Sequence, residues 1–365
     1  MSQAQPNARL GVIDRFLPVW ILAAMALGIL MGEIFPNLGT ALDRVKVADV
    51  SLPIAIGLIW MMYPVLAKVK YGRAATMLSN GKLLGTTTVL NWVIGPLLMF
   101  ILAWTFLPDE PAYRTGLILI GLARCIAMVL IWNMLACGDN EVAAVLVAIN
   151  SVFQIVMYSI LGWFYLVQVP EWLGLDQTGF DVSMSMIARN VAIFLGIPLL
   201  AGALTRVLLT RRRGEEWYEE SFLPRIGPTA LLGLLYTIVL MFAMQGQRII
   251  DQPMVIVRIA IPLLIYFVLM FFIAFFYARA QGFAYEETTA IAFTAAGNNF
   301  ELAIAVAIGL FGISSGEALA GVIGPLIEVP VLVALAYVAL WMRDRLQFSK
   351  QSPSAASTIR KVSTS

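Results

Sequence analysis

Three ionisable residues interrupt long apolar stretches of the chain and are the first candidates for chemistry. Arg124, Glu301 and Glu328 each lie well inside a stretch of mostly apolar residues. Charged groups in such surroundings are costly to desolvate and usually serve a function, such as binding a substrate or carrying protons. A structural ion pair that holds helices together is the alternative. We predict that this cation and these two carboxylates form one buried network.

A second candidate segment combines polar side chains with residues that interrupt helices. Gly297 is followed by Asn298 and Asn299, and this combination disfavours a continuous helix. Backbone groups freed by a break must bond to other protein groups or to a ligand. The matching place in the first half of the chain is the segment around Arg124, which has no strong helix breaker after Gly121. We predict Asn298 and Asn299 as substrate contacts at a helix break.

Polar residues also gather in the middle of the apolar range 142–166. They are Asn150, Ser151 and Gln154. One interpretation places Asn150 and Gln154 in the substrate site, facing the broken helices. Hydrogen bonding between helices explains them equally well. We interpret Asn91, in an earlier apolar range, as structural.

The two cysteines, Cys125 and Cys137, lie 12 positions apart in one apolar segment. That is about 18 Å along a helix, which is too far for a disulfide. A lone buried cysteine is usually a small packing residue. However, Arg124 precedes Cys125, and a guanidinium favours the thiolate form, which binds soft metals and metalloids. Both interpretations of Cys125 stay open, and Cys137 is interpreted as structural. The 17 scattered methionines are interpreted as lipid-facing or packing residues and not as a path for a soft metal.

Composition identifies the class of protein that positions these residues. The chain has 365 residues, of which 60% are hydrophobic and 13% charged. Soluble proteins carry about 25% charged residues, so the sequence predicts an all-α membrane protein. The chain has no histidine and no paired-cysteine motif, so we expect no metal site and no cofactor. A nucleophile–base pair and a basic, aromatic-rich patch are also missing, which argues against an enzyme and against a nucleic-acid partner.

Hydropathy predicts about ten membrane-spanning helices. Their ranges are 16–32, 51–69, 84–106, 114–137, 142–166, 184–209, 223–243, 255–277, 285–311 and 318–341. The predicted divisions are an N-terminal cytoplasmic segment 1–15, a first five-helix repeat 16–166, an external loop 167–183, a second five-helix repeat 184–341 that includes a cytoplasmic loop 210–222, and a cytoplasmic tail 342–365 without fixed structure.

The orientation and the repeat follow from charge and proline patterns. Most of the 24 basic residues fall on the side that holds both termini, which predicts cytoplasmic termini in an inner membrane. Pro96 and Pro262 are each followed by two leucines at matching places in the two halves. An odd number of helices per half would invert the second copy. Inverted repeats are typical of transporters that bind their substrate near the middle of the bilayer.

Four segments resemble the arsenical-resistance arsenite permeases, which belong to the bile acid/sodium symporter superfamily. The resemblance covers about 10–341 and is carried by Arg124-Cys125-Ile126-Ala127-Met128-Val129, Asn150-Ser151-Val152-Phe153-Gln154, Gly297-Asn298-Asn299-Phe300-Glu301 and Gly324-Pro325-Leu326-Ile327-Glu328-Val329-Pro330.

The resemblance implies two inverted five-helix repeats, arranged as a panel domain and a core domain. It also implies that the fourth and ninth helices are broken and cross each other. Members of this family export arsenite, and some export antimonite, in exchange for protons. The required cysteine of the family corresponds to Cys125 and its required carboxylate to Glu301, while Arg124 and Glu328 match further positions linked to transport.

Without histidine, the protons of such an exchange must be carried by carboxylates or by the thiol. The hypothesis is that Glu301 releases a proton inward and then favours arsenite loading, with Glu328 as a second coupling residue. Reprotonation from outside would then drive release. The alternative function is a sodium-coupled symporter of an organic anion, for which Cys125 would be dispensable. A membrane enzyme or a sensor is the alternative from another class.

Overall fold

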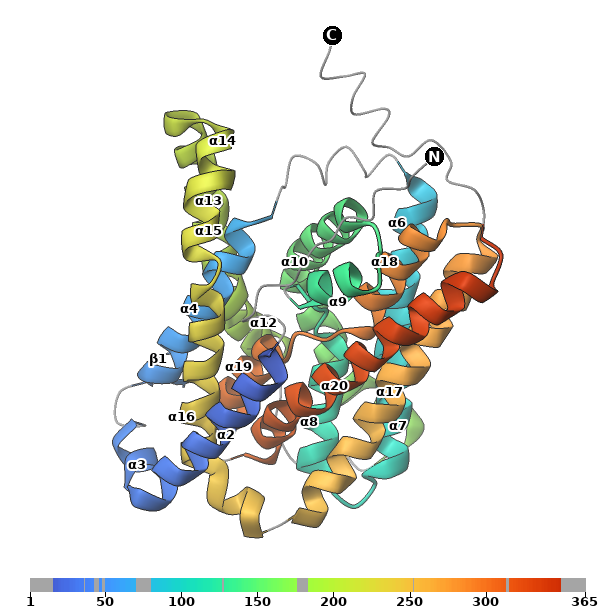
Figure 1. Cartoon of the computed structure of the whole chain (residues 1–365). Helices are drawn as coiled ribbons and strands as arrows, with labels where there is room; N and C mark the ends of the chain where they lie inside the picture. The colour runs from blue at the N-terminus through green and yellow to red at the C-terminus, as the bar shows by residue number, and fades with distance from the viewer. Residues whose placement is uncertain are drawn as a thin grey trace.

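The computed structural model of the chain is an assembly of helices with one short β-hairpin (Figure 1). It describes residues 16–35, 37–42, 46–47, 50–69, 80–126, 128–175, 183–251, 253–312 and 315–348. The predicted segment 1–15 and the tail after Phe348 lie outside the described residues. The hairpin pairs strand β1 (Lys46–Val47) with strand β2 (Val50–Ser51) in antiparallel register.

Helix is present in every range that hydropathy marks as a membrane span. The first half contains α2 (Leu17–Ile34), α3 (Leu38–Leu42), α4 (Leu52–Ala67), α6 (Gly81–Val89), α7 (Gly95–Phe106), α8 (Pro111–Leu122), α9 (Val129–Leu135), α10 (Asn140–Trp163) and α11 (Val169–Leu173). The second half contains α12 (Met184–Val191), α13 (Ile197–Arg213), α14 (Glu215–Trp217), α15 (Leu223–Ile226), α16 (Thr229–Asp251), α17 (Pro253–Ala280), α18 (Tyr285–Ala296), α19 (Phe300–Phe311) and α20 (Gly316–Arg345).

Several of these helices are joined by a widened π turn. The four π turns are η1 (Leu90–Ile94), η2 (Phe164–Gln168), η3 (Ala192–Gly196) and η4 (Tyr218–Phe222). Each ends two residues before a proline, namely Pro96, Pro170, Pro198 and Pro224. Proline has no N–H and its ring clashes with the carbonyl four residues back. The wider turn absorbs that clash, so the helices continue through the proline without breaking.

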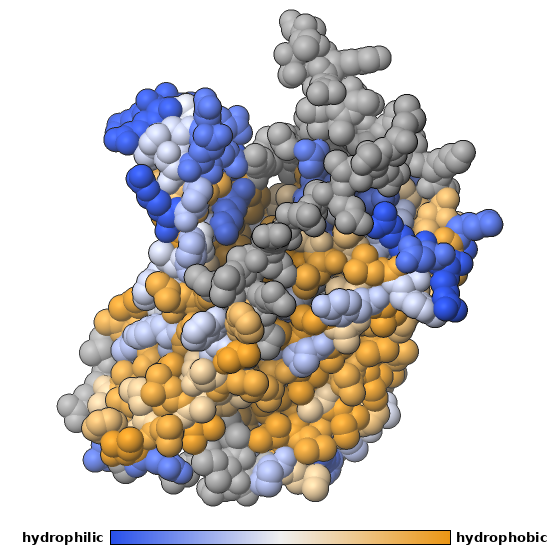
Figure 2. Space-filling view, in the orientation of Figure 1, coloured by the Kyte–Doolittle hydropathy of each residue, from blue (hydrophilic) through white to orange (hydrophobic). Residues whose placement is uncertain are grey.

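The described helices show that this is a multi-pass membrane protein. By length and composition, six of them can cross a bilayer: Gly81–Phe106, Asn140–Leu173, Met184–Arg213, Glu215–Met244, Pro253–Ala280 and Gly316–Arg345. Shorter apolar helices are Val19–Ile34, Leu52–Ala67 and Phe300–Phe311. Figure 2 shows a broad apolar surface, with polar residues gathered at the end where α13 and α14 project. The count of ten crossings and the inverted repeat stay predictions.

Helix also extends into both segments that the sequence assigns to loops. In the external segment, α11 continues to Leu173, and residues 176–182 lie outside the described part. In the segment 210–222, α13 runs to Arg213 and is followed by α14 and η4. Arg206 pairs there with Glu215 at 3.3 Å and with Glu219 at 2.6 Å. Arginine and glutamate are good helix formers, so hydropathy marks the end of lipid contact and not the end of the helix.

The helices pack as two groups. In the first group, α16 lies against α2 and α4, and α13 also packs on α4. In the second group, α17, α18, α19 and α20 pack with one another and with α7, α8 and α10. In Figure 1, α4 and α16 lie to the left of the helices that surround α20. The resemblance implies a panel domain and a core domain, and that division stays a prediction.

Candidate functional site

Helices α8 and α18 both end inside the second helix group, and the chain continues in an extended conformation. Ala123 follows α8 with φ −83° and ψ 117°, and Gly297 follows α18 with φ −74° and ψ 147°. Immediately after them, Arg124 and Asn298 pair as an isolated antiparallel β-bridge. The two predicted helix breaks therefore meet, including the first one, which the sequence marks only weakly.

Backbone hydrogen bonds join the two breaks on both sides of the bridge. The N–H of Cys125 donates to the carbonyl of Gly297 at 3.2 Å, and the N–H of Asn299 donates to the carbonyl of Ala123 at 3.1 Å. A Cβ atom on Gly297 would lie 3.0 Å from the Cβ of Cys125, so glycine permits this close approach. Groups freed from two helices thus satisfy each other, as unhydrated backbone at membrane depth requires.

Asn298 completes the end of α8 with its side chain. Its Nδ2 donates to the carbonyl of Ile120 at 2.7 Å and to that of Ala123 at 3.1 Å. Its backbone N–H donates to Oε1 of Glu328 on α20 at 3.0 Å. Only 2% of Asn298 is exposed. The amide and the carboxylate together fix the crossing segment against α8 and α20.

Asn299 starts the helix that carries the third candidate charge. Its Oδ1 accepts from the N–H of Leu302 at 3.1 Å, so it is the N-cap of α19. Glu301 then lies in the first turn of this helix and is partly buried. A carboxylate in the first turn is stabilised by the positive end of the helix dipole.

Arg124 directs its side chain to backbone groups at the ends of two half-helices. Its Nη1 donates to the hydroxyl of Tyr266 at 3.0 Å and to the carbonyl of Ala295 at 3.2 Å, while Nη2 donates to the carbonyl of Gly121. Its backbone N–H donates to Oε1 of Gln154 at 2.9 Å. The residue is fully buried. A cation is favourable here because both carbonyls belong to the negative ends of helix dipoles.

The polar residues of α10 lie close to the two helix breaks and form hydrogen bonds mainly with other protein groups. Gln154 accepts from the backbone of Arg124 as described, and Asn91 donates to Oδ1 of Asn150 at 3.4 Å. Ser151 donates to the backbone of its own helix at 2.7 Å. The side-chain nitrogens of Gln154 and Asn150 are buried and have no partner among the described residues. Hydrogen bonding between helices therefore explains part of this set. The side-chain NH₂ groups of Asn150 and Gln154 have no hydrogen-bond acceptor among the described residues.

A cavity of about 310 Å³ lies between the two helix groups, next to the segments where the two helix breaks meet. It reaches from Lys68 and Gly227 to Ile126 and Glu301. A small cavity of about 20 Å³ adjoins it and is lined by Cys125, Asn298, Asn299 and Glu301 together with Met61, Met62, Val65, Ile126 and Met128. A second small cavity, also of about 20 Å³, extends from Glu301 along α19 to Pro325.

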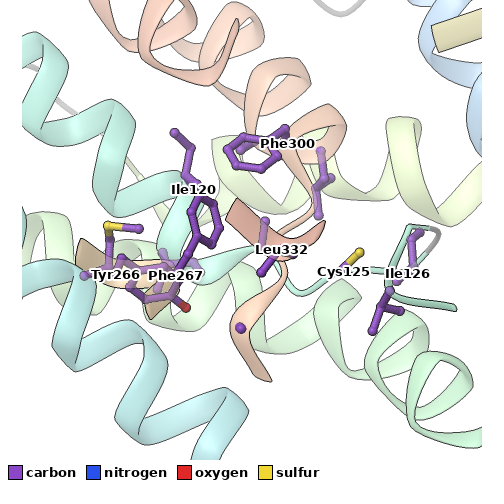
Figure 3. Close-up of a cluster of buried hydrophobic side chains, with 14 of the residues drawn as sticks. Ile120, Cys125, Ile126, Tyr266, Phe267, Phe300 and Leu332 are labelled. Carbon is purple, nitrogen blue, oxygen red and sulfur yellow. The ribbon is translucent and has the colours of Figure 1, made fainter. Parts of the chain in front are cut away.

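The structure thus divides the predicted site residues into two sets. The residues Cys125, Asn298, Asn299 and Glu301 line a cavity. The other set, which lines none of these three cavities, is Arg124, Asn150, Gln154 and Glu328. In the view of Figure 3, Cys125 and Ile126 lie to the right of Leu332, and Tyr266 and Phe267 lie to its left. Tyr266 is a contact that the sequence does not reveal, and its only signal is a tyrosine near the middle of the apolar range 255–277.

The two adjacent asparagines of the crossing should differ in their contribution to stability. Asn298→Ala removes two hydrogen bonds to the buried end of α8, whose two carbonyls each keep one backbone donor, and we expect the free energy of unfolding to fall by about 2 kcal/mol. Asn299→Ala removes one helix cap and should cost about 1 kcal/mol. Denaturant unfolding of both variants in detergent measures the difference. Equal losses would show that the side chain of Asn298 does not hold the end of α8.

Comparison with known proteins gives three related chains and one family. Residues 55–252 match the Sodium Bile acid symporter family. An arsenical-resistance protein Acr3 of Corynebacterium glutamicum is 54% identical over 345 residues, which cover 94% of this chain and 93% of that protein. An arsenical-resistance protein Acr3 of Alkaliphilus metalliredigens is 33% identical over 341 residues, covering 90% and 93%. An uncharacterized transporter of Synechocystis sp. is 35% identical over 348 residues, covering 90% and 88%.

Proposed function

Because this chain belongs to the arsenical-resistance permeases of the Sodium Bile acid symporter family, we propose that it exports arsenite from the cytoplasm in exchange for protons. The family membership confirms the resemblance drawn from the sequence, and it makes the protein a transporter and not an enzyme. Antimonite, which shares the chemistry of arsenite, belongs to the same proposal as a second substrate.

The observation that carries the proposal is the set of groups around the small cavity. Cys125 offers a sulfur ligand, Asn298 and Asn299 offer amides, and Glu301 offers a carboxyl group. Arsenous acid combines an arsenic centre with affinity for sulfur and hydroxyl groups that donate and accept hydrogen bonds. A space of about 20 Å³ holds roughly one water molecule, so the substrate would sit where this cavity joins the larger one.

The position of the larger cavity supports loading from the cytoplasm. It reaches Lys68 and Gly227, which lie on the side that the distribution of basic residues assigns to the cytoplasm. In this proposal the protein lies in the inner membrane, both termini are cytoplasmic, and the repeats 16–166 and 184–341 are inverted copies. The pairing of one helix break from each half supports the repeat.

The hydrogen bonds of Arg124 favour proton coupling over sodium coupling. Carbonyl groups at helix ends are ligands that a sodium ion could use. At this crossing the carbonyls of Gly121 and Ala295 accept from the guanidinium of Arg124. The protein thus supplies its own cation at the place where an ion would bind. We therefore assign coupling to protons, carried by Glu301 and Glu328.

The test is arsenite uptake into everted membrane vesicles under an imposed pH gradient. We expect uptake by the native protein to follow the gradient and to be independent of sodium, and we expect Cys125→Ser to abolish it. Cys137→Ser is the matched control, because Cys137 is exposed and lies outside the three cavities. Vesicles that contain folded native protein but take up no arsenite would refute the substrate and favour the sodium–organic anion alternative.

A further inference from the structure

One residue of α4 faces the candidate site from the opposite helix group. Met61 lines the large cavity and both small cavities, and Glu301 is the other residue common to all three. Only 4% of Met61 is exposed. Because Met61 lies on α4 and Glu301 on α19, these two side chains face the same space from the two sides of the boundary between the helix groups.

The position of Met61 is fixed by a close contact between α4 and α16. A Cβ atom on Gly233 of α16 would lie 2.9 Å from the backbone nitrogen of Met61 and 3.0 Å from its Cα. Only a residue without a side chain therefore allows α16 to lie so near the backbone of Met61. Since the Cβ of Met61 also lies 3.2 Å from this position, its side chain begins between α4 and α16 and extends to the cavities that it lines.

The sulfur atom of Met61 matches the substrate class of the proposed function, on which this inference rests. A thioether is polarisable, accepts hydrogen bonds only weakly and has no proton to lose. Soft sulfur ligands favour soft centres. Trivalent arsenic accepts electron density opposite its As–O bonds, so a substrate at Cys125 could also contact a second sulfur. We propose that Met61 is a specificity-determining residue that contacts the metalloid from the α4 side of the site.

The test compares two buried methionines. Met61→Leu preserves side-chain volume and removes the sulfur. Met342→Leu is the matched control, since Met342 is similarly buried, with 3% exposed, and lines none of the three cavities. For arsenite uptake into everted vesicles we expect Met61→Leu to raise KM roughly five-fold with little change in the maximal rate, which indicates lost substrate binding. Met342→Leu should raise KM less than about two-fold.

A third variant separates the role of sulfur from that of packing. Met61→Cys keeps a sulfur atom, and we expect a KM closer to that of the native protein than to that of Met61→Leu. Unfolding temperatures in detergent should stay similar for all three variants. The same KM for Met61→Leu and Met342→Leu, or a higher KM in Met61→Cys than in Met61→Leu, would overturn the role of Met61 while leaving arsenite export intact. Native vesicles without arsenite uptake would instead overturn the proposed function itself.

Discussion

Arg124→Lys should remove most arsenite transport and lower the free energy of unfolding by about 3 kcal/mol. The planar guanidinium donates to Tyr266, Ala295 and Gly121 at once. A lysine ammonium is a point charge on a flexible stem and cannot reproduce this fork. The carbonyls at the ends of two half-helices would then lose their shared donor. Denaturant unfolding in detergent and arsenite uptake into vesicles measure the two effects.

The same substitution at a more exposed arginine is the matched control. Arg258, at the start of α17, pairs with Asp109 and lies 3.5 Å from Glu110. The hydrogen bond from Arg258 lowers the pKa of Asp109 below its usual value, so this pair stays charged at neutral pH. Ion pairs in contact with water contribute little, and a lysine can replace the arginine. Arg258→Lys should therefore leave transport and unfolding nearly unchanged. If both variants lost equally little transport and stability, Arg124 would contribute only its charge, which lysine keeps.

The candidate cavity residues could be predicted because polarity is conspicuous in an apolar chain. Cys125, Asn298, Asn299 and Glu301 are singled out by type and position, and the structure brings all four to one cavity. The role of Arg124 could not be predicted in the same way. Residues adjacent in extended backbone project to opposite sides. Arg124 therefore turns toward Tyr266, while Cys125 faces the cavity, and sequence adjacency to the thiol does not mean that the guanidinium activates it.

The fold was predictable to the level of helix positions, and less so at their ends. The break after α8 has no proline or paired asparagine to mark it, because its partner supplies the bonds: Asn298 donates to the carbonyls of Ile120 and Ala123. A break stabilised by another segment leaves no local signal. Met61 is hidden for a similar reason. It is one of 17 methionines, and its place on all three cavities, which the local sequence does not show, distinguishes it from the others.

Glu301→Gln should uncouple arsenite movement from the pH gradient. Glutamine keeps the shape of the side chain and one oxygen acceptor but cannot release or bind the transported proton. We expect gradient-driven uptake into everted vesicles to fall roughly 100-fold, the scale of losing a positioned proton carrier. Exchange of labelled for unlabelled arsenite without a gradient should persist within about five-fold of the native rate, because Cys125, Asn298 and Asn299 still line the cavity.

Glu328→Gln is the comparison that assigns the coupling between the two carboxylates. Oε1 of Glu328 accepts from the backbone of Asn298, and a glutamine oxygen can accept the same hydrogen bond. Glu301, in contrast, lines all three cavities, where a proton and the substrate can reach it. Because Glu328 is the less accessible of the two coupling residues, Glu328→Gln should keep part of its response to the pH gradient, at a reduced rate. A pH response that survives Glu301→Gln and disappears in Glu328→Gln would transfer the coupling role to α20.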